Sequence, residues 1–79
     1  MTEMKQFIEF VAKSVVDHPN EVSVTEAESD QTLILELRCN KEDAGKIIGR
    51  GGRTIKALRT LLVTAGAKQG VRAVLELVD

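Results

Sequence analysis

Residues 47–53 read Ile47-Ile48-Gly49-Arg50-Gly51-Gly52-Arg53, and this short glycine-rich stretch decides the fold. Three of the four residues from Gly49 to Gly52 are glycine, which adopts positive φ without a clash at Cβ. Segments with helical periodicity lie on both sides of the stretch, with almost no linker between them. The stretch therefore predicts a tight turn between two helices.

The helix before the turn is expected to be short. Asn40 is its predicted N-cap, and Asp43 stands three residues later, where its carboxylate helps to satisfy first-turn amides in a capping box. The predicted inner face consists of Ala44, Ile47 and Ile48.

The helix after the turn begins near Arg53 or Thr54. Its apolar stripe consists of Ile55, Leu58, Leu62 and Ala65. Gly66 and Gly70 are expected to bracket its exit, and a strand follows from Val71 to Val78.

The first part of the chain predicts a helix and a hairpin. The helix runs from about Glu3 to Asp17, since Pro19 disfavours its continuation. Its apolar stripe consists of Met4, Phe7, Ile8, Val11 and Val15. Two alternating segments around a polar break at 28–31 indicate a β-hairpin, with apolar positions at Val22, Val24, Leu33, Leu35 and Leu37. The order α-β-β-α-α-β predicts one α+β domain over 1–79, with three helices on one face of a three-stranded sheet.

Composition excludes several classes of function. The 79 residues hold one cysteine, Cys39, and one histidine, His18, so no internal disulfide and no zinc ligand set can form. Because no catalytic triad can be assembled either, we expect no enzyme, metal or cofactor. No apolar run approaches the ~20 residues of a membrane span. Met1 leads directly into a patterned segment, so we expect a cytoplasmic protein without a signal peptide.

Charge is distributed unevenly along the chain. The net charge is −1, but residues 44–59 hold five basic side chains and no acidic one, which leaves −6 on the rest. A local field of this kind acts on a ligand within about a Debye length. The five residues are Lys46, Arg50, Arg53, Lys56 and Arg59. The glycine turn therefore lies within a basic segment of a chain whose remaining residues carry a net negative charge.

The turn carries chemistry suited to phosphate. The amides of Gly51, Gly52 and Arg53 are expected near a helix N-terminus, where partial positive charge favours anions. The arginines of the turn add full charges, and one of the two isoleucines before it is expected to line a groove for unstacked bases. Other glycine loops fit poorly, because the Lys-Ser/Thr of a P-loop and the third glycine of a dinucleotide fingerprint are both missing.

Ile-Ile-Gly-x-x-Gly between two helices resembles the signature of KH domains, whose loop clamps the backbone of about four nucleotides. The element order resembles the type II KH fold, which implies a mixed sheet, and the chain looks most like small bacterial single-KH proteins of the KhpA type. The resemblance implies single-stranded RNA as partner and a role as RNA chaperone or post-transcriptional regulator. The expected RNA-binding residues are Lys46, Ile47, Ile48, Gly49, Arg50, Gly51, Gly52, Arg53 and Lys56.

The resemblance also implies self-association as a homodimer and pairing with a larger KH protein of the KhpB/Jag type. In some bacteria that pair is connected with cell shape and cell-wall organisation. From the residues, Leu61 at the edge of the third helix is the favoured dimer contact. Contact between sheets through Ile34 and Val74 is the rival.

Simpler interpretations stand beside these. The glycines can form a purely structural turn, and the basic residues a solvated helical face. Arg59, at a flank, can pair with an acid, and His18 fits an exposed helix-end residue. A protein-interaction subunit with weak or shared RNA binding is therefore the alternative function.

Overall fold

The computed structural model describes residues 2–78. The order α-β-β-α-α-β is confirmed, with short 3-10 turns added before β1, before α2 and within the glycine turn. The elements are α1 (Thr2–Val15), η1 (Pro19–Glu21), β1 (Ser23–Ser29), β2 (Thr32–Arg38), η2 (Lys41–Asp43), α2 (Ala44–Ile48), η3 (Arg50–Gly52), α3 (Arg53–Lys68) and β3 (Arg72–Val78).

The sheet is mixed, as expected for a type II KH arrangement. β2 is the central strand; it pairs antiparallel with β1 and parallel with β3. The hairpin between β1 and β2 closes through Asp30 and Gln31, both of which have positive φ (49° and 62°). Two positive φ values in a two-residue loop match the right-handed twist of the flanking strands.

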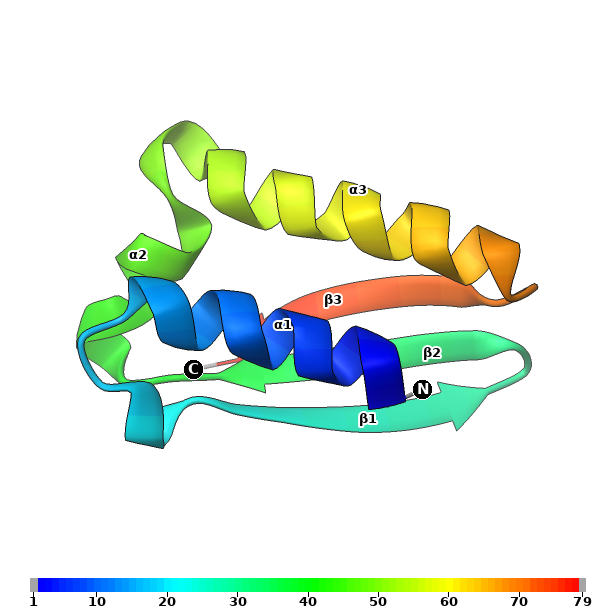
Figure 1. The fold of residues 1–79 in the computed structure, drawn as a ribbon, viewed down its shortest axis with the longest axis horizontal. Coiled ribbons are helices and arrows are strands. Elements are labelled where there is room, and N and C mark those ends of the chain that lie inside the picture. Colours follow the sequence, from blue (N-terminus) through cyan, green and yellow to red (C-terminus); the bar gives the residue numbers. More distant parts are fainter. Residues whose placement is uncertain (1, 79) are drawn as a thin grey trace.

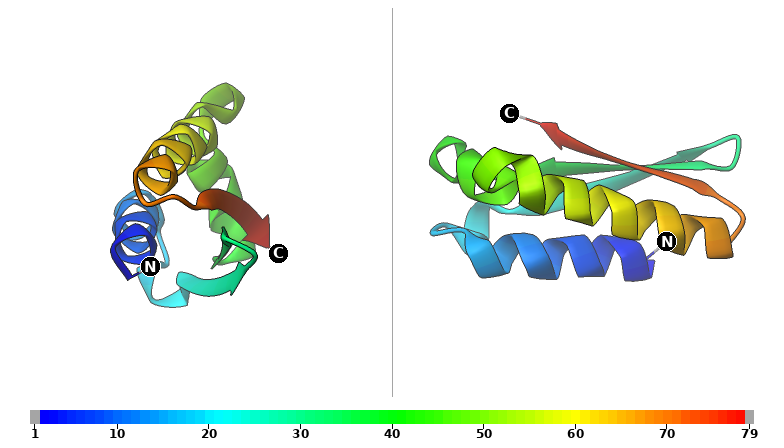
Figure 2. Two further views of the ribbon diagram at one scale, coloured as in Figure 1. Left: turned by 90° about the vertical axis from the view of Figure 1, so that its right-hand side faces the viewer. Right: turned by 90° about the horizontal axis from the view of Figure 1, so that it is seen from above.

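The helices lie on one side of the sheet. Figure 1 shows α1 above β1 and α3 above β3, with the short α2 at the end of the layer where α1 stops. Figure 2 shows the same two layers from the side and from above. Between them lies an aliphatic core built mainly by Met4, Ile8 and Ala12 of α1, Leu33, Leu35 and Leu37 of β2, and Ile55, Leu58 and Leu62 of α3. None of the helices within residues 2–78 is long and apolar enough to cross a membrane.

Two details of the predicted helices are wrong. α1 ends at Val15 rather than Asp17, and Phe7 and Val15 lie at the exposed margin of its stripe while Ala12 is buried. The buried line runs through positions four apart, Met4, Ile8 and Ala12, which share one side of a helix. The predicted stripe therefore included Phe7 and Val15, which are exposed at its margin, and omitted Ala12, which is buried.

Gly66 and Gly70 lie on either side of the end of α3 at Lys68, as predicted, with Gly66 inside the last turn of the helix. A Cβ at Gly66 would lie 2.7 Å from the carbonyl oxygen of Val71 and 3.2 Å from Cβ of Ala73. The missing side chain of Gly66 therefore permits the last turn of α3 to lie close to the start of β3. Gly70, with φ of 75°, lies just after the helix end.

Candidate nucleic-acid interface

The turn between α2 and α3 depends on glycine at three positions. Gly49, Gly51 and Gly52 have φ of 79°, 64° and 79°, values that residues with a Cβ rarely adopt. At Gly49 a Cβ would also lie 2.8 Å from Cβ of Thr54 and 2.9 Å from its backbone nitrogen. By contrast, nothing lies within 4 Å of a Cβ at Gly51, which faces open space. The turn is rigidly packed at its base and accessible at its tip.

The turn satisfies part of its own backbone, which corrects the predicted phosphate site. Gly52 N–H donates to the Gly49 carbonyl at 3.1 Å, and Arg53 N–H donates to the Arg50 carbonyl. Two of the three amides predicted to bind phosphate are therefore used inside the turn, because η3 closes as a 3-10 turn with its own hydrogen bonds. The Gly51 amide, at the open tip, is the remaining member of the predicted set.

Three basic side chains surround the turn. Arg50, Arg53 and Lys56 are all exposed, and within residues 2–78 none of them forms a salt bridge. Lys56 extends back toward the turn, since its Cε lies 3.8 Å from a Cβ placed on Gly52. These three charges are thus available to an anionic ligand at the open tip.

Lys46 and Arg59, the other basic residues of the segment, are engaged elsewhere. The Lys46 ammonium lies 3.1 Å from Oδ2 of Asp17, and this contact, more than any other, raises the pKa of Lys46 above its usual 10.5. Among residues 2–78 no acid pairs with Arg59; its Nε donates to the Leu75 carbonyl at 3.3 Å.

The two isoleucines before the turn divide between core and surface. Ile47 is fully buried, whereas the side chain of Ile48 is 38% exposed. The predicted inner face of α2 therefore loses Ile48, because a helix of one turn buries only the residue that points at the core. Of the pair, Ile48 alone is accessible to a ligand.

A groove of about 350 Å³ lies between α3 and the edge strand β3. Its walls include Arg59, Val63 and Ala67 from α3 and Val71, Arg72, Ala73, Val74 and Leu75 from the β3 side. The lining is mainly apolar and includes two arginines, Arg59 and Arg72. Such a surface suits flat, apolar groups carrying polar edges.

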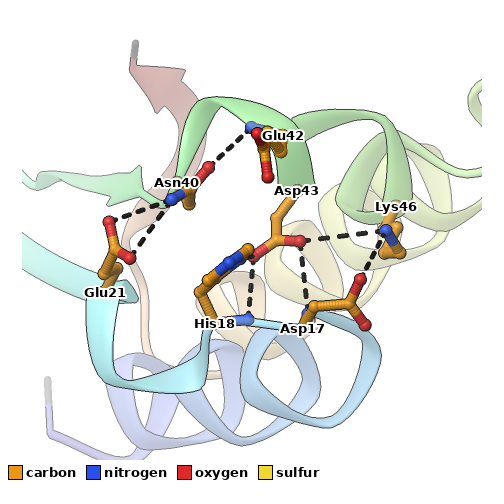
Figure 3. Close-up of polar contacts among 7 residues, drawn as sticks. All are labelled: Asp17, His18, Glu21, Asn40, Glu42, Asp43 and Lys46. Atoms are coloured by element: carbon orange, nitrogen blue, oxygen red, sulfur yellow. Dashed lines mark hydrogen bonds and ion pairs between the residues drawn. The ribbon is translucent and has the colours of Figure 1, made fainter.

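Below the turn, a polar cluster joins α2 to the end of α1 (Figure 3). The carboxylate of Asp43 is fully buried and accepts hydrogen bonds from the backbone amides of Asp17 (3.2 Å) and His18 (3.0 Å) and from Nδ1 of His18 (2.9 Å). Burial by itself raises the pKa of Asp43, but the bonds from His18 and from the two amides prevail and hold it below 3.8. The bond to Asp43 raises the pKa of His18 above 6.5.

The capping prediction is half correct. Asn40 caps η2 by accepting from Glu42 N–H at 2.8 Å, and its amide donates to Glu21. Asp43 forms no capping box; its carboxylate turns to the loop after α1 instead. One signal in the sequence points to this burial: Asp43 stands four residues before Ile47, on the inward side of the same helical segment.

A separate apolar surface lies on the helical layer. Leu61 of α3 is 51% exposed and Phe7 of α1 is 39% exposed, and Phe10, three residues after Phe7 on the same helix, is 71% exposed. A groove of about 260 Å³ between α1 and α3 is lined by Glu3, Met4, Phe7, Leu61, Leu62, Ala65 and Gln69. The sheet residues Ile34 and Val74 are more covered, at intermediate exposure.

Comparisons with known proteins agree with this geometry. The family model described as "KhpA/KhpB, KH domain" matches residues 5–77. The chain is 47% identical to "RNA-binding protein KhpA" of Chlamydia pneumoniae over 96% of this chain and 97% of the relative. It is 48% identical to the protein of the same name from Clostridium acetobutylicum, over 95% and 100%. Identity to the Aquifex aeolicus protein of that name is 43% over the full length of both chains.

The match covers the helix–turn–helix as well as the sheet, and the element order, the mixed strand pairing and the glycine turn are those expected of a type II KH fold. The chain belongs to the KhpA/KhpB family of KH domains.

Proposed function

We propose that this protein binds single-stranded RNA, with the turn Gly49–Gly52 against the phosphate backbone. The observation that carries the proposal is the open tip at Gly51 surrounded by Arg50, Arg53 and Lys56, whose charges have no internal partners within residues 2–78. Backbone that can approach closely, together with unpaired cations, is what a phosphate chain requires. The relatives from Chlamydia pneumoniae and Clostridium acetobutylicum are named RNA-binding protein KhpA, which supports the same assignment.

The bases then lie along the groove between α3 and β3. α3 starts at the turn, so a strand held at Gly51 is led past Ile48 toward Arg59 and the apolar groove walls. The two phenylalanines of the chain, Phe7 and Phe10, are on α1 and not in this groove. Since aromatic stacking contributes about 1–3 kcal/mol per base, its absence makes for modest affinity that depends strongly on salt. Such binding fits an RNA chaperone or post-transcriptional regulator in the cytoplasm.

Fluorescence anisotropy of a labelled single-stranded RNA, titrated at several salt concentrations, tests the clamp. The decisive variant is Arg50→Asp/Gly51→Asp, and its matched control is Arg50→Gln/Gly51→Asn. Both variants place a side chain at Gly51, where space is open but φ is 64°, a value that Asp and Asn tolerate better than most residues. The control therefore carries the same backbone cost and the same loss of Arg50 without adding negative charge.

We expect wild type to bind, the control to bind more weakly, and the acidic variant to lose binding while its circular dichroism spectrum stays unchanged. Equal binding by the wild type and the folded acidic variant would show that the turn is not the clamp. RNA binding absent even at low salt would remove the proposal altogether.

A second candidate is a protein-interaction subunit, favoured by the exposed apolar surface of Leu61, Phe7 and Phe10 beside the groove between α1 and α3. Exposed apolar surface grouped in this way marks protein contacts. Homodimerisation, or pairing with a larger KH protein, would cover it. Because Leu61 is more exposed than Ile34 and Val74, the helical edge is favoured over the sheet.

Sedimentation equilibrium of Leu61→Lys, with Val63→Lys as matched control, tests this surface. Val63 is exposed on the same helix but lines the groove beside β3. A dimer abolished by Leu61→Lys and kept by Val63→Lys supports the helical edge. A monomeric wild type, or a dimer that survives Leu61→Lys, contradicts it.

A further inference from the structure

Lys46 lies next to the turn but points away from it. It is on α2, one helical turn before Arg50, and its ammonium lies 3.1 Å from Oδ2 of Asp17 and 3.9 Å from Oδ1 of Asp43 (Figure 3). Lys46 is thus the one basic residue of the predicted clamp whose charge is already occupied by acids within residues 2–78.

Asp17 is the main ion-pair partner of the Lys46 ammonium. Asp43 already accepts from two backbone amides and from the ring of His18, and its distance to Lys46 is the longer one. The carboxylate of Asp17 makes the shorter contact with Lys46, and this contact is the largest influence on the pKa of Lys46.

The ion pair between Asp17 and Lys46 is also weak enough for Lys46 to exchange Asp17 for another anion. The side chain of Asp17 is 70% exposed and that of Lys46 is 45% exposed, so water screens their attraction. A lysine ammonium moves readily on its flexible four-carbon stem. Asp17 lies just beyond the C-terminal end of α1, where a negative charge is unfavourable next to the free carbonyls of the helix, so its replacement by Asn leaves the helix intact.

We propose that Asp17, a residue outside the turn, limits the RNA affinity of the clamp by holding Lys46 away from the phosphates. The inference rests on the proposed function, since it concerns the same clamp. In this arrangement Asp17 competes with phosphate for one ammonium group. Releasing Lys46 adds one cation to Arg50, Arg53 and Lys56 around the turn.

A double-mutant cycle tests the competition, with anisotropy titrations of one single-stranded RNA against wild type, Asp17→Asn, Lys46→Gln and Asp17→Asn/Lys46→Gln. We expect Asp17→Asn to lower Kd by about two- to fivefold, the range of an exposed ion pair. The slope of log K against log salt should steepen by about 0.7, the effect of one more phosphate neutralised on a single strand. Lys46→Gln alone should bind no more tightly than wild type, and in the double variant the gain should disappear.

Glu21→Gln is the matched control for overall charge. It removes one negative charge from the same end of the domain, but the Glu21 carboxylate is bonded to Asn40 and not to Lys46. It should change Kd less than Asp17→Asn and leave the salt slope unaltered. Thermal melting of each variant establishes that the fold is retained.

An unchanged Kd for Asp17→Asn overturns the inference, as does a gain that persists when Lys46 is replaced by Gln, or an equal gain with Glu21→Gln. In those cases Arg50→Asp/Gly51→Asp still loses binding and the clamp itself stands. If the wild type does not bind RNA at low salt, the clamp and this inference are both overturned.

Discussion

Nδ1 of His18 lies 2.9 Å from Oδ2 of Asp43, although the two residues are 25 positions apart. The contact joins the loop after α1 to the start of α2, the helix that leads into the glycine turn. Asp43 is fully buried, and its remaining acceptor capacity is used by backbone amides of that same loop. The base of the turn is therefore fixed to the loop after α1 by a buried carboxylate, and one of the donors to that carboxylate is a histidine.

The first prediction concerns pH. The pKa of His18 is raised above 6.5 by its bond to Asp43, so the folded state holds the proton more tightly than the unfolded state. The stabilisation is complete below about pH 6.5 and is lost as pH rises through the folded-state pKa. The pKa of Asp43 is lowered below 3.8, so its stabilisation is present above that value and is lost as acid protonates the folded state. Thermal melting should show highest stability between these limits.

His18 is the only histidine in the chain, which provides a clean control. His18→Gln keeps a group that can donate to Asp43 but does not titrate, so its melting temperature should stay level from pH 6 to pH 8 while that of wild type declines. The charged groups that act on His18 are Asp43, Glu21 and Glu42. Glu42→Gln should reduce the decline only slightly. Parallel curves for wild type and His18→Gln would contradict the assignment.

The second prediction separates two glycines of α2 and its turn. Gly49→Ala should destabilise the domain by about 2–4 kcal/mol, because the φ of 79° is strained for alanine and the new methyl group meets Thr54. Gly45→Ala should instead stabilise it by about 0.5–1 kcal/mol, since Gly45 is helical with nothing within 4 Å of a Cβ. Urea denaturation measures both free energies of unfolding. Similar values for the two variants would show that the turn is not packed on Thr54.

Much of this fold follows from local patterns. The alternation of Leu33, Leu35 and Leu37 predicts the central strand, and the spacing of Ile55, Leu58 and Leu62 predicts the buried face of α3; all six are buried. The glycine turn is equally predictable from the sequence, because its positive φ values depend on the glycines themselves. Periodicity and glycine content act over a few residues, so they need no knowledge of the tertiary structure.

The site was less predictable, because its details depend on which residues meet across the fold. No local rule tells that Asp43 turns to the amides of Asp17 and His18 rather than to its own helix. The direction of Lys46 follows from that same junction, so its ion pair with Asp17 could not be predicted from the sequence. The use of the Gly52 amide inside the turn likewise required the turn's actual geometry.

The third prediction concerns the crossing of α3 over β3. Gly66→Ala should destabilise the domain by about 1–3 kcal/mol, because the added methyl group meets the carbonyl of Val71 and the side chain of Ala73. Ala73→Gly in the same chain relieves only the second contact, so it should restore stability in part at most. Equal stability of Gly66→Ala and wild type would show that the helix and strand can move apart without cost.

The last prediction uses the isoleucine pair to separate folding from binding. Ile47 is fully buried, so Ile47→Val should cost about 0.5–1.5 kcal/mol of stability and leave RNA affinity of the folded protein unchanged. Ile48 is partly exposed beside the turn, so Ile48→Ala should cost less than about 1 kcal/mol but weaken RNA binding. Urea denaturation and anisotropy on the same samples compare the two effects. Weaker RNA binding by folded Ile47→Val, with Ile48→Ala unaffected, would place the base-contacting surface elsewhere than beside the turn.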